Sequence, residues 1–129
     1  MGRPAASELT DRELEVMHVF WARGPATVAE VREELINGGL DLAYTTVATL
    51  VRIIADKGFI EQTNEDRPFR YRPARSYEEV SGRLLKDVVE RVFRGSREQL
   101  LVRLMEEQRL SKKEQALLEQ ILREGGTKP

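Results

Sequence analysis

Hydrophobic positions recur at helical spacing in three segments of the first half of the chain. Residues 11–23, about 28–36 and about 43–57 each carry apolar residues three or four positions apart, which is typical of a helix with one buried face. Each segment is followed by residues that interrupt helices, namely Gly24-Pro25, Asn37-Gly38-Gly39 and Gly58. The pattern predicts two helices and a turn, followed by a longer helix.

Polar residues mark where the helices begin. Five segments open with Ser or Thr followed three residues later by Glu or Gln, a pair that satisfies free N–H groups at a helix start. These pairs are Thr10/Glu13, Thr27/Glu30, Ser76/Glu79, Ser96/Gln99 and Ser111/Glu114. Each precedes an apolar stretch at helical spacing, so together they predict most of the helix starts.

After Gly58 the pattern changes from helical to alternating. Residues 59–63 and 68–73 alternate in polarity on either side of a polar turn, which predicts a β-hairpin. In the second strand Phe69 and Tyr71 share one face, and Arg70 and Arg72 share the other. The aromatic side chains are expected to pack inward, while the arginines project toward solvent or a ligand.

From Ser76 onward the pattern is helical, with breaks near Gly95 and residues 109–111. Three helices with wide apolar faces need a partner surface. The residues expected at that surface, assigned below to dimerisation, are Leu84, Leu85, Val88, Val89, Val92, Phe93, Leu101, Leu104, Met105, Leu118, Ile121 and Leu122. The order of elements predicts a mainly α fold with a small β-hairpin wing: a winged helix-turn-helix domain over residues 1–75 and a helical dimerisation domain over 76–129.

Composition narrows the class of protein. The chain has 129 residues and no cysteine, which excludes disulfides, thiolate metal sites and a cysteine nucleophile. It has no apolar stretch long enough for a membrane span and no apolar leader, so a cytoplasmic location is expected. No metal-ligand spacing or catalytic motif occurs, so neither a metal, a cofactor nor an enzyme activity is predicted. Acids such as Glu13 and Glu15 are expected to lie on solvated helix faces, and His18 to be a partly buried structural residue.

Charge gives a mixed picture. The formal net charge of −1 argues against binding to nucleic acid, where cations neutralise phosphates. However, Arg67, Arg70, Arg72 and Arg75 fall in one stretch without Asp or Glu. This stretch indicates a local basic element on an otherwise acidic surface.

The third predicted helix carries the candidate chemistry. Val47, Leu50, Val51 and Ile54 share one face and are expected in the core. The opposite face offers hydroxyl, methyl and guanidinium groups that suit base edges and phosphates in a major groove. Thr45, Ala48 and Thr49 suit base edges, Arg52 can reach guanine or a phosphate, and Tyr44 and Thr46 at the edges of the face could contact bases or phosphates. The hairpin arginines Arg67, Arg70 and Arg72 are expected along the DNA backbone. Asp56 would repel phosphate, so either the end of this helix leaves the groove or Asp56 pairs with Arg52.

A second interpretation stays open at this point. An exposed Thr/Ala/Arg helix face can be plain solvated surface, and the hairpin arginines can pair with Glu61 or Glu65. A winged-helix module that binds protein rather than DNA would fit the acidic first half and Asp56. Salt-dependent binding to duplex DNA separates the two interpretations.

Several stretches resemble the BlaI/MecI penicillinase-repressor family. Residues 9–17 with Phe20-Trp21 look like the family's opening, and residues 41–50 look like its recognition helix. Lys57-Gly58-Phe59-Ile60 is similar to the exit from that helix, and Phe69-Arg70-Tyr71 to the wing. The resemblance implies a homodimeric repressor on an inverted repeat in a promoter, with interlocking C-terminal helices and double-stranded DNA as its partner. By the family's pattern, the residues at bases would be Thr45, Thr46, Ala48 and Thr49, and those near phosphates Tyr44, Arg52, Arg67 and Arg70.

The chain also departs from the family's pattern. Ile53 stands where many members have arginine, so backbone contacts there are expected to differ. In antibiotic-responsive members a sensor pathway cuts an Asn-Phe bond, whereas the corresponding pair here is Arg103-Leu104. Copper-responsive members use a cysteine cluster that this chain lacks. The sequence therefore identifies no sensor, protease partner or inducing signal.

Overall fold

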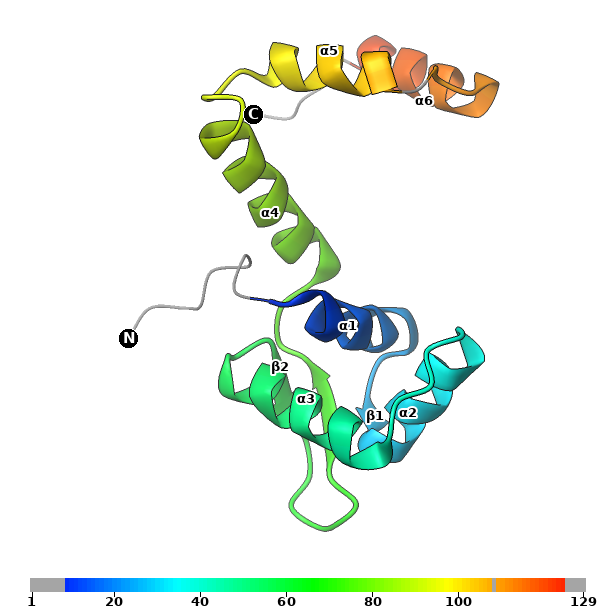
Figure 1. The fold of residues 1–129 in the computed structure, drawn as a ribbon, viewed down its shortest axis with the longest axis vertical. Coiled ribbons are helices and arrows are strands. Elements are labelled where there is room, and N and C mark those ends of the chain that lie inside the picture. The colour runs from blue at the N-terminus through cyan, green and yellow to red at the C-terminus, as the bar shows by residue number, and fades with distance from the viewer. Residues whose placement is uncertain (1–8, 108, 125–129) are drawn as a thin grey trace. The chain divides into compact units, whose positions relative to one another are not determined.

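The computed structural model describes residues 9–107 and 109–124, which contain six helices and three short strands. The helices are α1 (Asp11–Arg23), α2 (Val28–Asn37), α3 (Tyr44–Asp56), α4 (Tyr77–Arg91), α5 (Arg97–Glu107) and α6 (Lys112–Arg123). The strands are β1 (Ala26–Thr27), β2 (Ile60–Gln62) and β3 (Arg70–Pro73) (Figure 1). The predicted fold class, mainly helical with a small β-hairpin wing, is confirmed.

The predicted caps stand at the helix starts. Thr10/Glu13, Thr27/Glu30 and Ser111/Glu114 each form the reciprocal pair of hydrogen bonds between side chain and backbone. The hydroxyls of Ser76 and Ser96 accept from the backbone N–H three residues later, at 3.0 and 3.1 Å. Local chemistry therefore fixes where these helices begin.

The sheet has one strand more than the predicted hairpin. β1 pairs antiparallel with β3, in the strand order β1-β3-β2. Its two residues join the hairpin to the start of α2, with Ala26 opposite Tyr71 and Thr27 opposite Arg70. A strand of two residues has no alternation to read, which explains why the hydrophobic pattern did not predict it.

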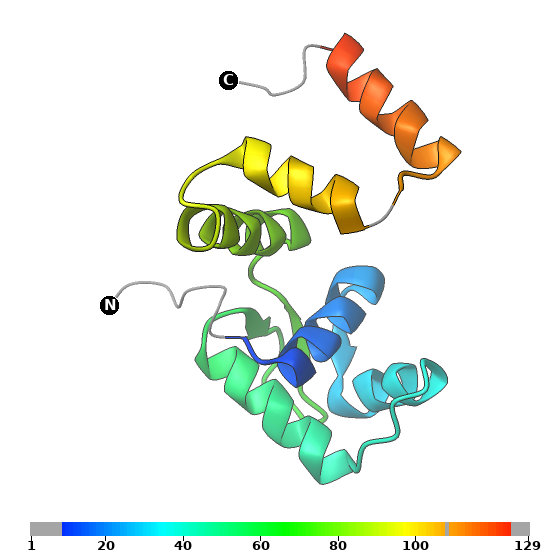
Figure 2. The ribbon, with the colours of Figure 1, turned by 45° about the horizontal axis from the view of Figure 1, so that its top comes forward.

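The chain divides into two compact units, Met1–Asp87 and Val88–Pro129. In the first unit α1, α2 and α3 pack against one another, as Figures 1 and 2 both show. Their buried residues form one core with Phe59 and Ile60, and the largest of these side chains are Phe20, Phe59, Met17, Ile54 and Ile60.

The first unit extends beyond the predicted domain limit at residue 75. Val80 of α4 is 1% exposed within the core of this unit, and Leu84 packs against the same core. The first part of α4 therefore contributes apolar surface to the winged unit. The division into functional domains at 75/76 stays a prediction.

The second unit exposes most of its apolar side chains. Among the described residues α6 has no buried side chain, and Leu118, Ile121 and Leu122 are 41, 42 and 68% exposed. No helix among the described residues is both long enough and apolar enough to cross a membrane.

Candidate nucleic-acid interface

Helix α3 has two chemically different faces. Val47, Val51 and Ile54 are buried in the core, and Leu50 packs partly against it. The residues predicted to contact DNA from this helix lie on its other side: Tyr44, Thr45, Thr46, Thr49 and Arg52 are exposed, and Ala48 is half-buried. The apolar spacing of the helix thus brings these six side chains to one accessible surface.

The hydroxyl of Thr49 is partly committed inside the helix. Its Oγ1 donates to the carbonyl oxygen of Thr45 at 2.9 Å, one turn earlier. A threonine that donates to its own helix keeps its acceptor lone pairs and its methyl group available. In this rotamer Thr49 can accept from a base amino group or pack against a thymine methyl.

The wing and α3 enclose a groove of about 720 Å³. Tyr44, Ala48, Thr49 and Arg52 line it from α3, and the start of α2 closes it at Thr27, Val28 and Ala29. The hairpin supplies Arg67, Pro68, Phe69 and Tyr71. The guanidinium carbon of Arg67 lies 5.2 Å from the centroid of the Phe69 ring, in a cation–π contact. Two elements predicted to bind DNA therefore form one concave surface.

Carboxylates pair with most of the arginines at this surface. Arg72 Nε lies 2.6 Å from Glu61, across the β2–β3 pair, as one of the alternatives drawn from the sequence had it. Arg52 lies 3.9 Å from Asp56, one turn along α3, which is the predicted pairing. Such exposed pairs contribute little stability, about 0.2–1 kcal/mol, so phosphate oxygens can compete for these arginines.

The carboxylate of Glu30 lies between three elements. It accepts the backbone N–H of Thr27 at 2.9 Å and contacts Arg70 of β3 at 3.1 Å and Arg23 of α1 at 3.2 Å. The Thr27 hydrogen bond lowers the pKa of Glu30 most; burial opposes it, and the charges of Arg70 and Arg23 lower it further. Arg70 of the apparently basic stretch is thus compensated by an acid that is distant in sequence.

Arg75, the fourth arginine of that stretch, belongs to the interior. It is 5% exposed, contacts Glu79 at 3.3 Å and lies 5.1 Å from the centroid of the Phe59 ring. Its carbonyl oxygen accepts from the indole Nε1 of Trp21 at 2.9 Å. Arg75 therefore packs at the end of the wing against the core, and its guanidinium group is not accessible to a ligand.

Two interpretations of polar residues on α1 are corrected by the structure. Glu13 is not solvated: its side chain is 5% exposed and Lys57 Nζ lies 2.8 Å from it. Burial raises the pKa of Glu13, but hydrogen bonds from Lys57 and Thr10 outweigh it and hold the pKa below its ordinary value. His18 is exposed rather than partly buried, with its ring 5.4 Å from Trp21 and 6.1 Å from Tyr77.

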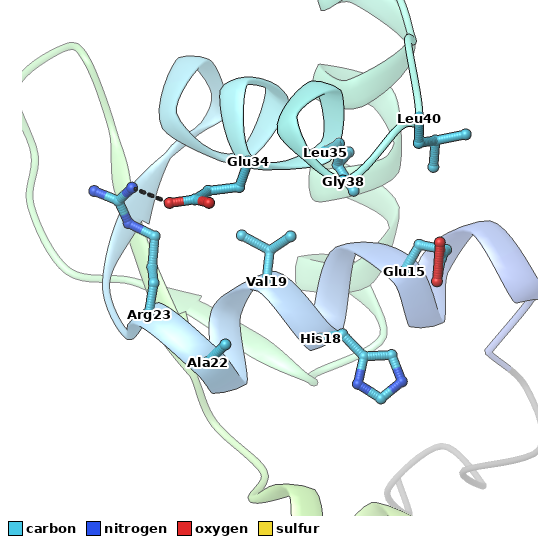
Figure 3. A pocket seen from close by; sticks show the side chains of 9 residues that line it. All are labelled: Glu15, His18, Val19, Ala22, Arg23, Glu34, Leu35, Gly38 and Leu40. Carbon is cyan, nitrogen blue, oxygen red and sulfur yellow. Dashed lines mark hydrogen bonds and ion pairs between the residues drawn. The ribbon is translucent and has the colours of Figure 1, made fainter.

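A second hollow lies between α1 and α2 (Figure 3). Val19 and Leu35 contribute apolar surface, and Glu15 and His18 stand at its α1 side. Arg23 reaches across to Glu34 at 3.2 Å, as the dashed line in Figure 3 marks. The described residues contain no cluster of His, Cys, Asp or Glu arranged to hold a metal ion.

The predicted dimerisation residues lie on α4, on the two residues that follow it, Val92 and Phe93, and on α5 and α6. The exposed members are Leu85, Val88, Val92, Leu101, Leu104, Met105, Leu118, Ile121 and Leu122. Leu84 and Phe93 are half-buried, and Val89 is buried at 9% exposure. The Arg103-Leu104 pair lies within α5.

The chain is similar to known transcriptional regulators in sequence and in fold. The chain is 37% identical over 102 residues to the transcriptional regulator BlaI of Mycobacterium tuberculosis, covering 78% of this chain and 73% of the relative. It is 27% identical over 115 residues to the methicillin resistance regulatory protein MecI of Staphylococcus aureus, covering 89% and 93%. The solution structure of the DNA-binding domain of the repressor BlaI superposes with a TM-score of 0.52 at 27% identity, covering 60% of this chain and 93% of that domain.

The family model of the penicillinase repressors matches residues 9–124, a range that includes all of the described residues. Its members are transcriptional repressors rather than enzymes. The opening, the recognition helix and the wing named from the sequence all lie within the match. The chain belongs to the penicillinase repressor family.

Proposed function

We propose that the protein is a homodimeric repressor that binds an inverted repeat in promoter DNA. The observation that carries the proposal is the division of α3 into a buried apolar face and an exposed face of threonines and Arg52. Such a helix beside a hairpin wing suits insertion into a major groove. A repressor must reach promoter DNA, so the proposal includes a cytoplasmic location.

In this proposal the start and middle of α3 read the bases. Thr45, Thr46 and Thr49 offer hydroxyl and methyl groups to base edges, and Ala48 offers a methyl group to thymine. Tyr44 lies in the first turn, where backbone N–H groups also favour phosphate. Asp56 pairs with Arg52 one turn earlier at 3.9 Å, so the last turn of α3 need not leave the groove to keep this carboxylate from phosphate.

The wing would contact the DNA backbone. Arg67, Arg70 and Arg72 are all exposed, and Arg67 lines the groove beside α3. Contacts to phosphate position a protein on the duplex without reading its sequence. We therefore assign Arg52 and the three wing arginines to affinity, and the threonines of α3 to sequence preference.

The C-terminal helices would form the dimer. Leu101, Leu104 and Met105 of α5 and the stripe of α6 at Leu118 and Ile121 are 41–56% exposed. Exposed apolar stripes on consecutive helices indicate a protein partner, and a second copy of the chain would place two winged units on two half-sites. The two-fold symmetry of such a dimer would require an inverted repeat.

A fluorescence-anisotropy titration tests the proposal, using duplexes selected from random sequence and scrambled controls at two salt concentrations. We expect tight, salt-sensitive binding of two chains to an enriched inverted repeat. Thr49→Ala should lose about 1–3 kcal/mol on the selected duplex and relax one position per half-site, whereas Arg70→Ala should weaken binding to all duplexes alike. Ser81→Ala is the matched control, since this α4 hydroxyl also donates within its own helix.

The pairing of Arg52, Arg70 and Arg72 with carboxylates favours a second candidate, a winged-helix module that binds protein. A well-folded protein that enriches no duplex would support this candidate and contradict the repressor proposal. Equal losses on selected and random DNA for both Thr49→Ala and Arg70→Ala would overturn the assignment of roles within the interface.

A further inference from the structure

The ion pair between Glu30 and Arg70 has a consequence for DNA affinity. We infer that Glu30 acts as an internal substitute for phosphate, which occupies the wing arginine Arg70 in the free protein and must be displaced when DNA binds. The inference rests on the proposed function, because it assigns Arg70 to a DNA phosphate. Glu30 would then be a positioning residue that lowers affinity for every duplex.

The geometry supports competition rather than a fixed structural bond. Arg70 Nη1 lies 3.1 Å from Glu30, but the Arg70 side chain is 46% exposed and reachable from solvent. The backbone at Arg70 is held separately, since its N–H donates to the Asn64 side chain at 2.7 Å and its carbonyl accepts from Thr63 N at 2.8 Å. The guanidinium group can therefore change partner while the strand stays in place.

Glu30 keeps other partners when Arg70 leaves. Its carboxylate accepts the Thr27 backbone N–H at 2.9 Å and lies 3.2 Å from Arg23 Nη2. A carboxylate left without partners would cost free energy, but these two contacts remain. The exchange of Glu30 for phosphate at Arg70 consequently leaves no charge unpaired.

The local charge is balanced in the free protein. Arg23 also contacts Glu34 at 3.2 Å, so two arginines and two carboxylates form one connected group (Figure 3 shows the Arg23–Glu34 end). An approaching phosphate therefore meets Arg70 with its charge already compensated. Removing the charge of Glu30 would expose that of Arg70 to the phosphate.

The test compares two substitutions that change net charge equally. Glu30→Gln removes the carboxylate charge, and a glutamine oxygen can still accept the Thr27 N–H, so the helix cap is retained. Glu34→Gln is the matched control, because Glu34 lies on the same helix and pairs with Arg23 of α1 rather than with the wing. Affinity for a scrambled duplex is measured by anisotropy on the full chain.

We expect Glu30→Gln to tighten binding about two- to fivefold, the range typical of one exposed ion pair, and Glu34→Gln to change it less than twofold. In an Arg70→Ala background Glu30→Gln should change binding by less than twofold, as Glu34→Gln does. Unchanged or weaker binding by Glu30→Gln, or the same gain without Arg70, would overturn the inference. If the wild-type chain binds no duplex at all, it is the proposed function that fails.

If Glu30→Gln does not fold, an NMR measurement on the wild-type chain tests the same inference. The Nε–H resonance of Arg70 in a ¹H–¹⁵N spectrum reports the partner of its guanidinium group. Saturation with duplex should shift this resonance, while that of Arg23 moves less because Arg23 keeps Glu30 and Glu34. An Arg70 resonance that stays in place on saturation would contradict the exchange of partners.

Discussion

The two compact units of this chain use their apolar residues in opposite ways. In the first unit, Met17 and Phe20 are fully buried, together with residues from every helix and from the wing. In the second unit, α6 leaves Leu117, Leu118, Ile121 and Leu122 exposed by 41–68%. Buried apolar surface stabilises a fold by itself, whereas an exposed stripe stabilises only when a partner covers it. The apolar surface of the first unit is therefore buried when one chain folds, whereas that of the second unit would be buried only in the proposed dimer.

The largest expected effect comes from the core of the first unit. Phe20→Ala should lower the free energy of unfolding by about 3–5 kcal/mol, because it removes a fully buried ring and leaves a cavity. Urea denaturation followed by the fluorescence of Trp21 measures this, since the chain has one tryptophan. Val102→Ala is the control: Val102 is 43% exposed and is not among the residues assigned to the dimer interface, so this variant should change the same transition by less than about 0.5 kcal/mol. Similar decreases in the free energy of unfolding for the two variants would contradict the difference between the two units.

The next effect locates the end of the first unit. The free energy of unfolding of a fragment of residues 1–87 should be about 2–3 kcal/mol higher than that of a fragment of residues 1–75, because the shorter fragment lacks Val80 and Leu84. The shorter fragment also loses Glu79, the partner of Arg75 at 3.3 Å, which adds to the difference. Equal unfolding midpoints in urea would show that α4 adds nothing to the winged unit and would favour the limit at 75/76.

A smaller effect addresses the exposed stripe. Leu118→Asp should weaken dimerisation about tenfold or more, since it would place a charge where the proposed interface buries an apolar side chain. Sedimentation equilibrium over a range of concentrations measures the dissociation constant. Ala116→Asp introduces the same charge on the other side of α6 and should leave it within about twofold. A dimer that tolerates Leu118→Asp would place the interface elsewhere.

The smallest effect concerns the buried carboxylate of α1. The pKa of Glu13 is lowered in the folded protein, so its contribution to stability is present above the pKa of the unfolded chain and is lost as pH falls through the lowered value. Glu13→Gln should therefore cost roughly 1 kcal/mol at pH 7 and progressively less in acid. Urea denaturation from pH 7 to pH 3 tests this, with exposed Glu15→Gln as the control. A difference that stays constant over that range would exclude the linkage.

Sequence patterns predicted the helices of this protein well because their signals are local. The end of α1 at Arg23 follows from Gly24-Pro25, and its start from Thr10 and Glu13, all within a few positions. The hairpin likewise follows from alternation over neighbouring residues. The exposed face of α3 could be predicted for the same reason, since its helical period places Val47 and Val51 inward.

Ion pairs between residues that are distant in sequence could not be predicted. Glu13 meets Lys57 across 44 positions, and Glu30 meets Arg70 across 40, and no local pattern encodes either pair. Arg75 belongs to the core because Phe59 and Glu79 surround it, although its sequence neighbours make it look basic and exposed. Charge counted along the chain therefore overstated the free positive charge of the wing, which the fold largely compensates.

Thr27 limits which sequences this fold can tolerate. The residue is a member of β1 opposite Arg70, is 6% exposed, and its hydroxyl caps α2 by accepting from Glu30 N at 3.2 Å. Valine would suit the strand and the burial but not the cap, while aspartate would suit the cap but not the burial. In a saturation-mutagenesis library selected for folding, position 27 should accept threonine and serine and reject nearly everything else, even though β1 is among the shortest elements of the molecule.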